Sequence, residues 1–267
     1  MTWTSPVNDD TPARLSAIEP GIPEYMRSHV AEWAGGALGG EYNTKHGVIS
    51  MMSLQLKVAM PTHISLLERY LSDSTDGFLV TALDWLLYHD SDARSRSGIL
   101  KIILDQGRSE WTVNAIGEGK PRMTRRIPEG VEAVLSNTVD RTGAAGSLLA
   151  EAFNSIYGAA PNPNHAYDMC VKAVETKVCP LFLPDNTRAT LSSVYNHLSH
   201  KEVSLPLRET NMSDKDLIIA MMNKLFVGAE RHGSESYEHV SLEGAKTALS
   251  LATALISMFH ENVVTVS

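Results

Sequence analysis

The residues best suited to chemistry are Arg231, His232 and Gly233, close to the C-terminal end of the sequence. Arginine is a permanent cation, histidine titrates near neutrality, and glycine lets the backbone turn. A cation beside an acid–base group suits an anionic ligand such as a phosphodiester. The same residues could instead end a helix, because basic side chains and a following glycine are both favoured at helix C-termini.

Two helices are expected on either side of this triplet, within the stretch from Asp216 to Glu261. Apolar side chains recur there at spacings of three and four, and Ser241 is a suitable N-cap for the second helix. The polar connection between the helices, residues 234–239, would form the rim of a site. The second helix is rich in Ala, Ser and Thr, a composition that suits close packing against a partner helix.

Glu175 is a further candidate, in a helix predicted over His165–Cys179 after an Asn-Pro start signal. Its side chain lies off the apolar stripe of that helix. Glu175 could pair with a surface cation such as Lys172, which would contribute little to stability. Alternatively, it could act as an acid that orients Arg231 or His232.

Other chemical motifs are weak. His197 and His200 are three residues apart on a predicted helix, but no carboxylate lies at the spacing of a zinc-binding HExxH motif. Cys170 falls on an apolar stripe, and Cys179 is nine residues away, too far for a disulfide along one helix. No GxSxG motif is present. We therefore expect neither a metal nor a cofactor.

The composition is that of a globular protein, with 43% hydrophobic and 20% charged residues. A formal charge of −8 argues against broad binding to a nucleic-acid backbone, although Arg122, Arg125 and Arg126 could form a local basic patch. No apolar run is long enough to span a bilayer, and no export signal is recognisable. With only two cysteines, we expect a reducing, cytoplasmic setting and no membrane association.

The elements before residue 145 are predicted to be helical except for one β-hairpin. Helices are expected over Glu24–Ala34, 62–72, Asp76–His89, 92–106 and Val131–Asp140, and hairpin strands within Ser109–Ala115 and Arg122–Ile127. The stretch Val48–Val58 fits either a strand or a helix. In the helix before Gly107, we expect Ile99, Ile102 and Ile103 to point inward.

These patterns predict a mainly α fold in three parts. Residues 1–60 form an N-terminal arm with short elements, 61–145 a helical region with the hairpin, and 146–267 a helical bundle. Glycines at Gly143 and Gly146 suggest the last boundary. Within the bundle, the prolines Pro180 and Pro184 are expected to stop the helix that carries Glu175.

The bundle resembles the HEPN superfamily, specifically the C-terminal domain of abortive-infection-type proteins. The resemblance covers residues 147–261 and rests on NPNHAYDMCVKAVETKVCP, on PDNTRATLSSVYNHL, and on NKLFVGAERHG followed by VSLEGAKTALSLATALISMF. It implies an all-α bundle that usually forms a homodimer, and a role in phage defence. Many members are metal-independent ribonucleases that use an arginine and a histidine separated by four to six residues.

By this resemblance His232 would be the acid–base group acting on a ribose 2′-OH, and an arginine would stabilise the phosphorane charge. The sequence departs from the motif, since Met222 stands where the arginine would fall and Arg231 adjoins His232. Lys224 or Arg231 would then supply the cation, and RNA would be the substrate. The alternative is an inactive bundle that binds a protein partner or a nucleotide.

Overall fold

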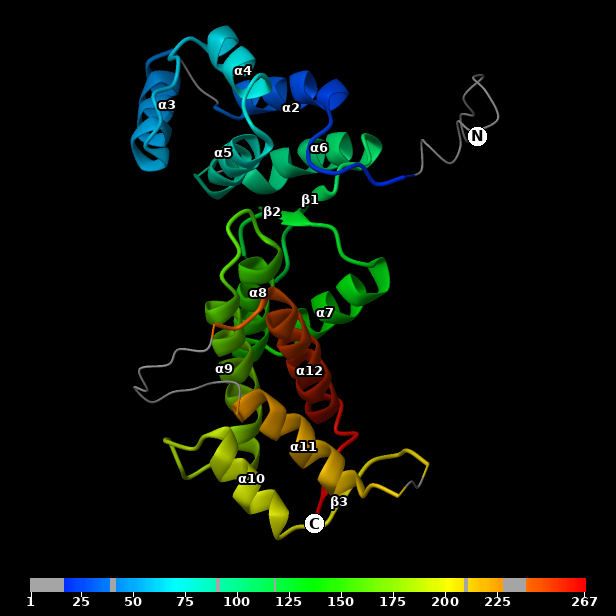
Figure 1. Ribbon diagram of the computed structural model, residues 1–267. Helices are drawn as coiled ribbons and strands as arrows, with labels where there is room; N and C mark the ends of the chain where they lie inside the picture. Colours follow the sequence, from blue (N-terminus) through cyan, green and yellow to red (C-terminus); the bar gives the residue numbers. More distant parts are fainter. Residues whose placement is uncertain (1–16, 39–41, 90–91, 118, 209–210, 228–238) are drawn as a thin grey trace, which may run out of the picture. The chain divides into compact units, whose positions relative to one another are not determined.

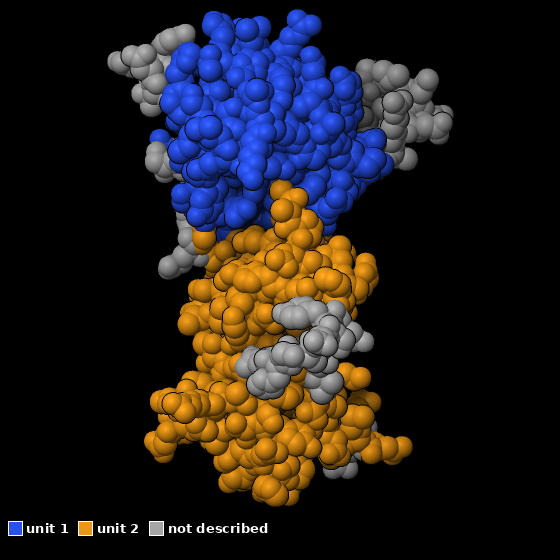
Figure 2. Space-filling model, turned by 60° about the vertical axis from the view of Figure 1, so that its left-hand side comes forward, with its two compact units in different colours: residues 1–115, 120–126 blue, residues 116–119, 127–267 orange. Residues whose placement is uncertain are grey.

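The computed structural model describes residues 17–38, 42–89, 92–117, 119–208, 211–227 and 239–267. These residues are mainly helical, with one small antiparallel hairpin and a few short strands, so the expected fold class is confirmed (Figure 1). Contacts divide the chain into two compact units, coloured separately in Figure 2. Unit 1 comprises Met1–Ala115 and Lys120–Arg126, and unit 2 comprises Ile116–Gly119 and Ile127–Ser267. The predicted boundary at Gly143–Gly146 lies inside unit 2.

Unit 1 is a set of helices with one hairpin. Its helices are α2 (Glu24–Ala37), α3 (Tyr42–Leu56), α4 (Ile64–Ser72), α5 (Asp76–His89) and α6 (Ala93–Gln106). Strands β1 (Trp111–Asn114) and β2 (Arg122–Arg125) pair antiparallel, with Trp111 opposite Arg125. The stretch 48–58, which fitted either element, is helical as far as Leu56, where α3 ends. Ile22 anchors the segment before α2, since its side chain is almost wholly buried.

Helix α6 corrects one prediction about the core. Its fully buried residues are Leu100 and Leu104, whereas Ile99 is 59% exposed and Ile102 is 60% exposed. Ile103 is only partly buried. Leu100 and Leu104 are four residues apart, as are Ile99 and Ile103. Periodicity alone therefore could not decide which of the two apolar stripes packs against α2, α5 and β1. The isoleucines therefore lie on the outer side of α6.

Unit 2 is built around one long helix. Its helices are α7 (Glu129–Arg141), α8 (Ala144–Tyr157), α9 (Pro163–Phe182), α10 (Leu191–Ser199), α11 (Asp214–Val227) and α12 (Leu242–His260). The two-residue strands β3 (Val203–Ser204) and β4 (Thr265–Val266) pair antiparallel. Helix α9 packs against α8, α10, α11 and α12. It therefore connects most of the helices of this unit.

The ends of α9 follow from its sequence, with one correction. The Asn162 side chain accepts a hydrogen bond from the His165 amide at 3.2 Å, and Pro163 opens the helix, as predicted. The helix does not stop before Pro180 but continues to Phe182. Proline costs the hydrogen bond that its own amide would have made to the carbonyl four residues earlier, and its fixed φ still fits the last helical turn.

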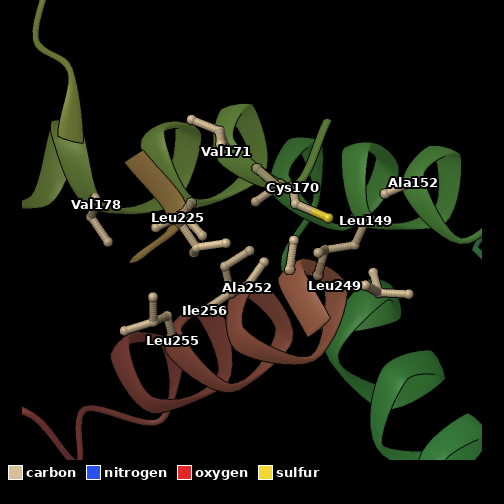
Figure 3. Packing of buried hydrophobic residues seen from close by; sticks show 14 of the residues in the cluster. Leu149, Ala152, Cys170, Val171, Val178, Leu225, Leu249, Ala252, Leu255 and Ile256 are labelled. Carbon is tan, nitrogen blue, oxygen red and sulfur yellow. The ribbon is translucent and has the colours of Figure 1, made fainter. Parts of the chain in front are cut away.

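Small side chains let the helices of unit 2 approach closely. Figure 3 shows Cys170 of α9 and Leu225 of α11 near Leu249 and Ala252 of α12. Ala152 of α8 belongs to the same cluster and is fully buried. The apolar face of α12, which the sequence offers for close packing, is thus covered within unit 2 by α8, α9 and α11.

The glycines predicted as a domain boundary have a packing role between α7 and α8. Gly143 has a φ of +56°, a conformation that side chains other than glycine rarely adopt. Gly146 lies against the backbone of Val139, where an added Cβ would come within 2.8 Å of the carbonyl carbon and closer still to the oxygen. These glycines therefore form a tight contact between two helices of one unit.

Candidate functional site

Arg231, His232 and Gly233 lie outside the described residues, in the segment 228–238. Its described neighbours are α11, which carries Lys224 in its last turn, and Val240, which precedes α12. The structure therefore describes the residues on both sides of the predicted site.

Both flanks are held by the first turns of α9. The Tyr167 hydroxyl donates to the backbone carbonyl of Lys224 at 2.9 Å, and the Val240 amide donates to the Asn164 side chain at 2.9 Å. Burial raises the pKa of Tyr167, so its hydroxyl stays protonated and can donate. His232 is eight residues from Lys224 and eight from Val240 in the sequence. The start of α9 therefore contacts the described residues on both sides of the segment that carries Arg231 and His232.

A histidine–carboxylate pair lies in the same turn of α9. His165 Nε2 is 2.7 Å from Glu151 Oε1 of α8, and the side chains are 41% and 52% exposed. Because a carboxylate accepts, Nε2 is the donor, which leaves Nδ1 of a neutral imidazole as a proton acceptor. A histidine oriented in this way can serve as a general acid or base.

This pair was not predicted from the sequence. His165 was only the first residue of a predicted helix, and Glu151 was not a candidate. The signal was present in the short connection between two predicted helices, which makes α8 and α9 antiparallel neighbours. The spacing of fourteen residues across that connection does not match a local motif, so only the tertiary contact reveals the pair.

Glu175 of α9 makes a hydrogen bond to the start of α10 that the sequence did not predict. Its Oε1 accepts a hydrogen bond from the Leu191 amide at 3.1 Å, at the start of α10. A carboxylate at a helix N-terminus satisfies an amide that has no partner within the helix, and it complements the helix dipole. Glu175 is eight residues beyond Tyr167, roughly 12 Å along α9. The structure therefore does not bring Glu175 to the start of α9.

The arginines expected to form a basic patch are each paired with a carboxylate. The pairs are Arg122 with Asp84, Arg125 with Glu110, and Arg126 with Asp105, at 2.6–2.9 Å. The hydrogen bonds that Arg122 donates to Asp84 are the largest of the effects that raise the pKa of Arg122. Since a paired guanidinium is partly neutralised, this stretch offers less attraction to phosphates than its sequence suggests.

The remaining candidates are part of the packing of unit 2. Met222, where the resemblance would place an arginine, is almost wholly buried in the core. Burial raises the pKa of the Cys170 thiol to about 12, so it stays neutral and packs as a small apolar group. Within the described ranges, no group of three side chains is arranged to hold a metal ion. Nor does any helix of these ranges have the length and apolar character to cross a membrane.

Comparison of the chain with protein-family models, curated proteins and solved structures finds no match. The HEPN-like assignment therefore stays a prediction from the sequence.

Proposed function

We propose that the protein cleaves RNA by metal-independent acid–base catalysis, as a HEPN-like ribonuclease of the abortive-infection type in phage defence. The observation that supports this most is the pair His165–Glu151 in the first turn of α9. The same two turns hold both flanks of the segment with Arg231 and His232. Two histidines and a cation are the groups that cleavage through the ribose 2′-OH requires.

The chemistry would divide between the two histidines. One imidazole removes the proton from the 2′-OH, and the 2′-oxygen attacks phosphorus. The other imidazole donates a proton to the leaving 5′-oxygen, so that the products are a 2′,3′-cyclic phosphate and a free 5′-hydroxyl. Arg231, or Lys224 from the end of α11, would stabilise the extra charge on the phosphorane. No metal takes part in this scheme.

The charge of the chain limits how RNA would bind. A protein with a net charge of −8, whose hairpin arginines are paired, gains little from non-specific phosphate contacts. RNA would therefore be held locally, at the basic residues near the start of α9.

The test is cleavage of total cellular RNA by the purified protein in EDTA. We expect His232→Ala and His165→Ala each to lower the rate by about 100-fold or more, the usual contribution of a general acid or base. Glu151→Gln should lower it less, because the imidazole remains. His200→Ala is the matched control, since it removes an exposed histidine of the same unit. A wild-type protein without activity, or a His232→Ala variant as active as wild type, would refute the proposal.

Glu175 and Met222 favour a second candidate, a bundle without activity that binds a partner. Glu175 was a candidate acid, yet it binds the start of α10. Met222, where the resemblance would place an arginine, fills the core. The bundle would then mediate a homodimer, or bind a protein or a nucleotide. Sedimentation of the purified protein tests the homodimer, and calorimetry with ATP and GTP tests the nucleotide.

A further inference from the structure

Unit 1 has a groove between α2 and α6. The two helices are antiparallel, because the Tyr25 hydroxyl donates to the Gly107 carbonyl at 2.8 Å at one end and Arg96 donates to the Ala37 carbonyl at 2.9 Å at the other. The cavity between them has a volume of about 470 Å³. Its lining residues span positions 29–37 of α2, so the groove is about 12 Å long.

The lining is mostly apolar. Trp33 and Ala37 from α2 face Ile99 and Ile103 from α6. Ile102 extends this apolar face, since it and Ile99 are about 60% exposed. Three isoleucines at helical spacing, on the outer side of a helix, form the kind of surface that a protein partner covers.

Gly35 and Gly36, adjacent in α2, differ in the space around them. A Cβ on Gly35 would collide with the end of the Glu68 side chain, which would have to move within unit 1. A Cβ on Gly36 would meet nothing within 4 Å, although Gly36 lines the groove. Glycine inside a helix is costly, and here it leaves room for the backbone of another segment to approach.

Of the charged side chains that line the groove, Arg96 is paired and Glu32 is available. Arg96 is paired with Asp92 at 3.6 Å and also donates to the Ala37 carbonyl. Glu32 is exposed at the groove wall, and it makes no ion pair with any residue that the structure describes. A partner with a basic group would therefore find an available carboxylate there.

We propose that the α2–α6 groove binds an amphipathic helix of a partner protein, with an aliphatic face flanked by lysine or arginine. The aliphatic face would cover Ile99, Ile102 and Ile103, with its backbone closest at Gly36, and a basic side chain would reach Glu32. A second copy of the chain suits this groove less well, because each copy carries a net charge of −8. The proposal does not depend on cleavage of RNA by unit 2.

The test measures fluorescence anisotropy of two labelled synthetic helices, each of about four turns. The peptides share an aliphatic face with leucines at i, i+3, i+4 and i+7, and their flanks carry lysine in one and glutamate in the other. We expect the full-length protein to bind the lysine peptide about tenfold more tightly, a difference that Glu32→Gln should remove.

Groove variants identify the site. Ile99→Lys and Gly36→Phe should each weaken binding of the lysine peptide by about tenfold or more. The control for Ile99→Lys is Leu54→Lys, on an exposed apolar side chain of α3 that does not line the groove. Gly36→Ala adds only a methyl group, so it should weaken binding less than Gly36→Phe does. Absence of binding, equal binding of both peptides, or equal effects of Ile99→Lys and Leu54→Lys would overturn the proposal. So would a dimer of the protein alone that Ile99→Lys dissociates.

Discussion

Substitution of Gly146 by alanine tests the packing of α7 against α8. In an isolated helix this change is stabilising by about 1 kcal/mol, because glycine is a poor helix former. In unit 2 the new methyl group would collide with the backbone of Val139. A backbone carbonyl cannot rotate away as a flexible side chain can, so the end of α7 must move.

The two effects have opposite signs, and the collision is the larger. Overpacking a well-packed contact costs about 1–3 kcal/mol, and a backbone collision belongs at the upper end. Subtracting about 1 kcal/mol of helix propensity leaves a net loss of about 2 kcal/mol. Gly36→Ala is the matched control, since its Cβ meets nothing within 4 Å. It should raise the free energy of unfolding by about 0.5–1 kcal/mol.

The distribution of tryptophan separates the two units in a urea titration. All four tryptophans, Trp3, Trp33, Trp85 and Trp111, belong to the part of the chain assigned to unit 1. Tryptophan fluorescence therefore reports the unfolding of unit 1, whereas helical circular dichroism reports the unfolding of both units. With a slope of about 2 kcal/mol per molar urea, Gly146→Ala should lower the dichroism midpoint assigned to unit 2 by about 1 M. Gly36→Ala should raise the fluorescence midpoint by about 0.3–0.5 M.

An unchanged or raised midpoint for Gly146→Ala would refute the close approach of α8 to Val139. A lowered midpoint for Gly36→Ala would instead show that Gly36 has a packing partner of its own.

Two further predictions concern buried polar groups. Asp84→Asn should lower the free energy of unfolding of unit 1 by about 2 kcal/mol. This is less than for a fully buried ion pair, because Arg122 is partly exposed. Tryptophan fluorescence in urea measures the change, and Asp73→Asn, which alters an exposed ion pair, should have little effect. The raised pKa of Cys170, about 12 against an ordinary value of 9.0, favours the folded state only while the thiol is protonated. Unit 2 should therefore lose stability as the pH rises from about 9 toward 12, and Cys170→Ala should weaken that dependence in dichroism-monitored urea titrations. A wild-type dependence that persists unchanged in the variant would contradict this role of the thiol.

The elements were largely predictable because their signals are local. The helix over Asp76–His89 was predicted with its observed bounds, and the N-cap Asn162 forms the expected hydrogen bond. The exposed Ile99 and Ile102 show the limit of this approach. A helix with apolar residues on two sides has two possible core faces, and only its neighbours in the fold select one of them.

The candidate site was less predictable because its contacts are tertiary. The pairing of His165 with Glu151 depends on how α8 and α9 pack, which no spacing within either helix encodes. Glu175 was recognised as lying off the apolar stripe, but its hydrogen bond to the start of α10 depends on the turn at 183–190. The hypothesis for Arg231 and His232 remains a prediction, since both lie outside the described residues.

The division of the hairpin between the units has a consequence for folding during synthesis. Its strands belong to unit 1, while Ile116–Gly119 belong to unit 2, where Ile116 is buried with Leu149 and Phe153. Unit 1 can be completed as soon as Arg126 has left the ribosome. Ile116 is covered only after α8 has been synthesised, so the nascent chain exposes this apolar side chain between two folding events.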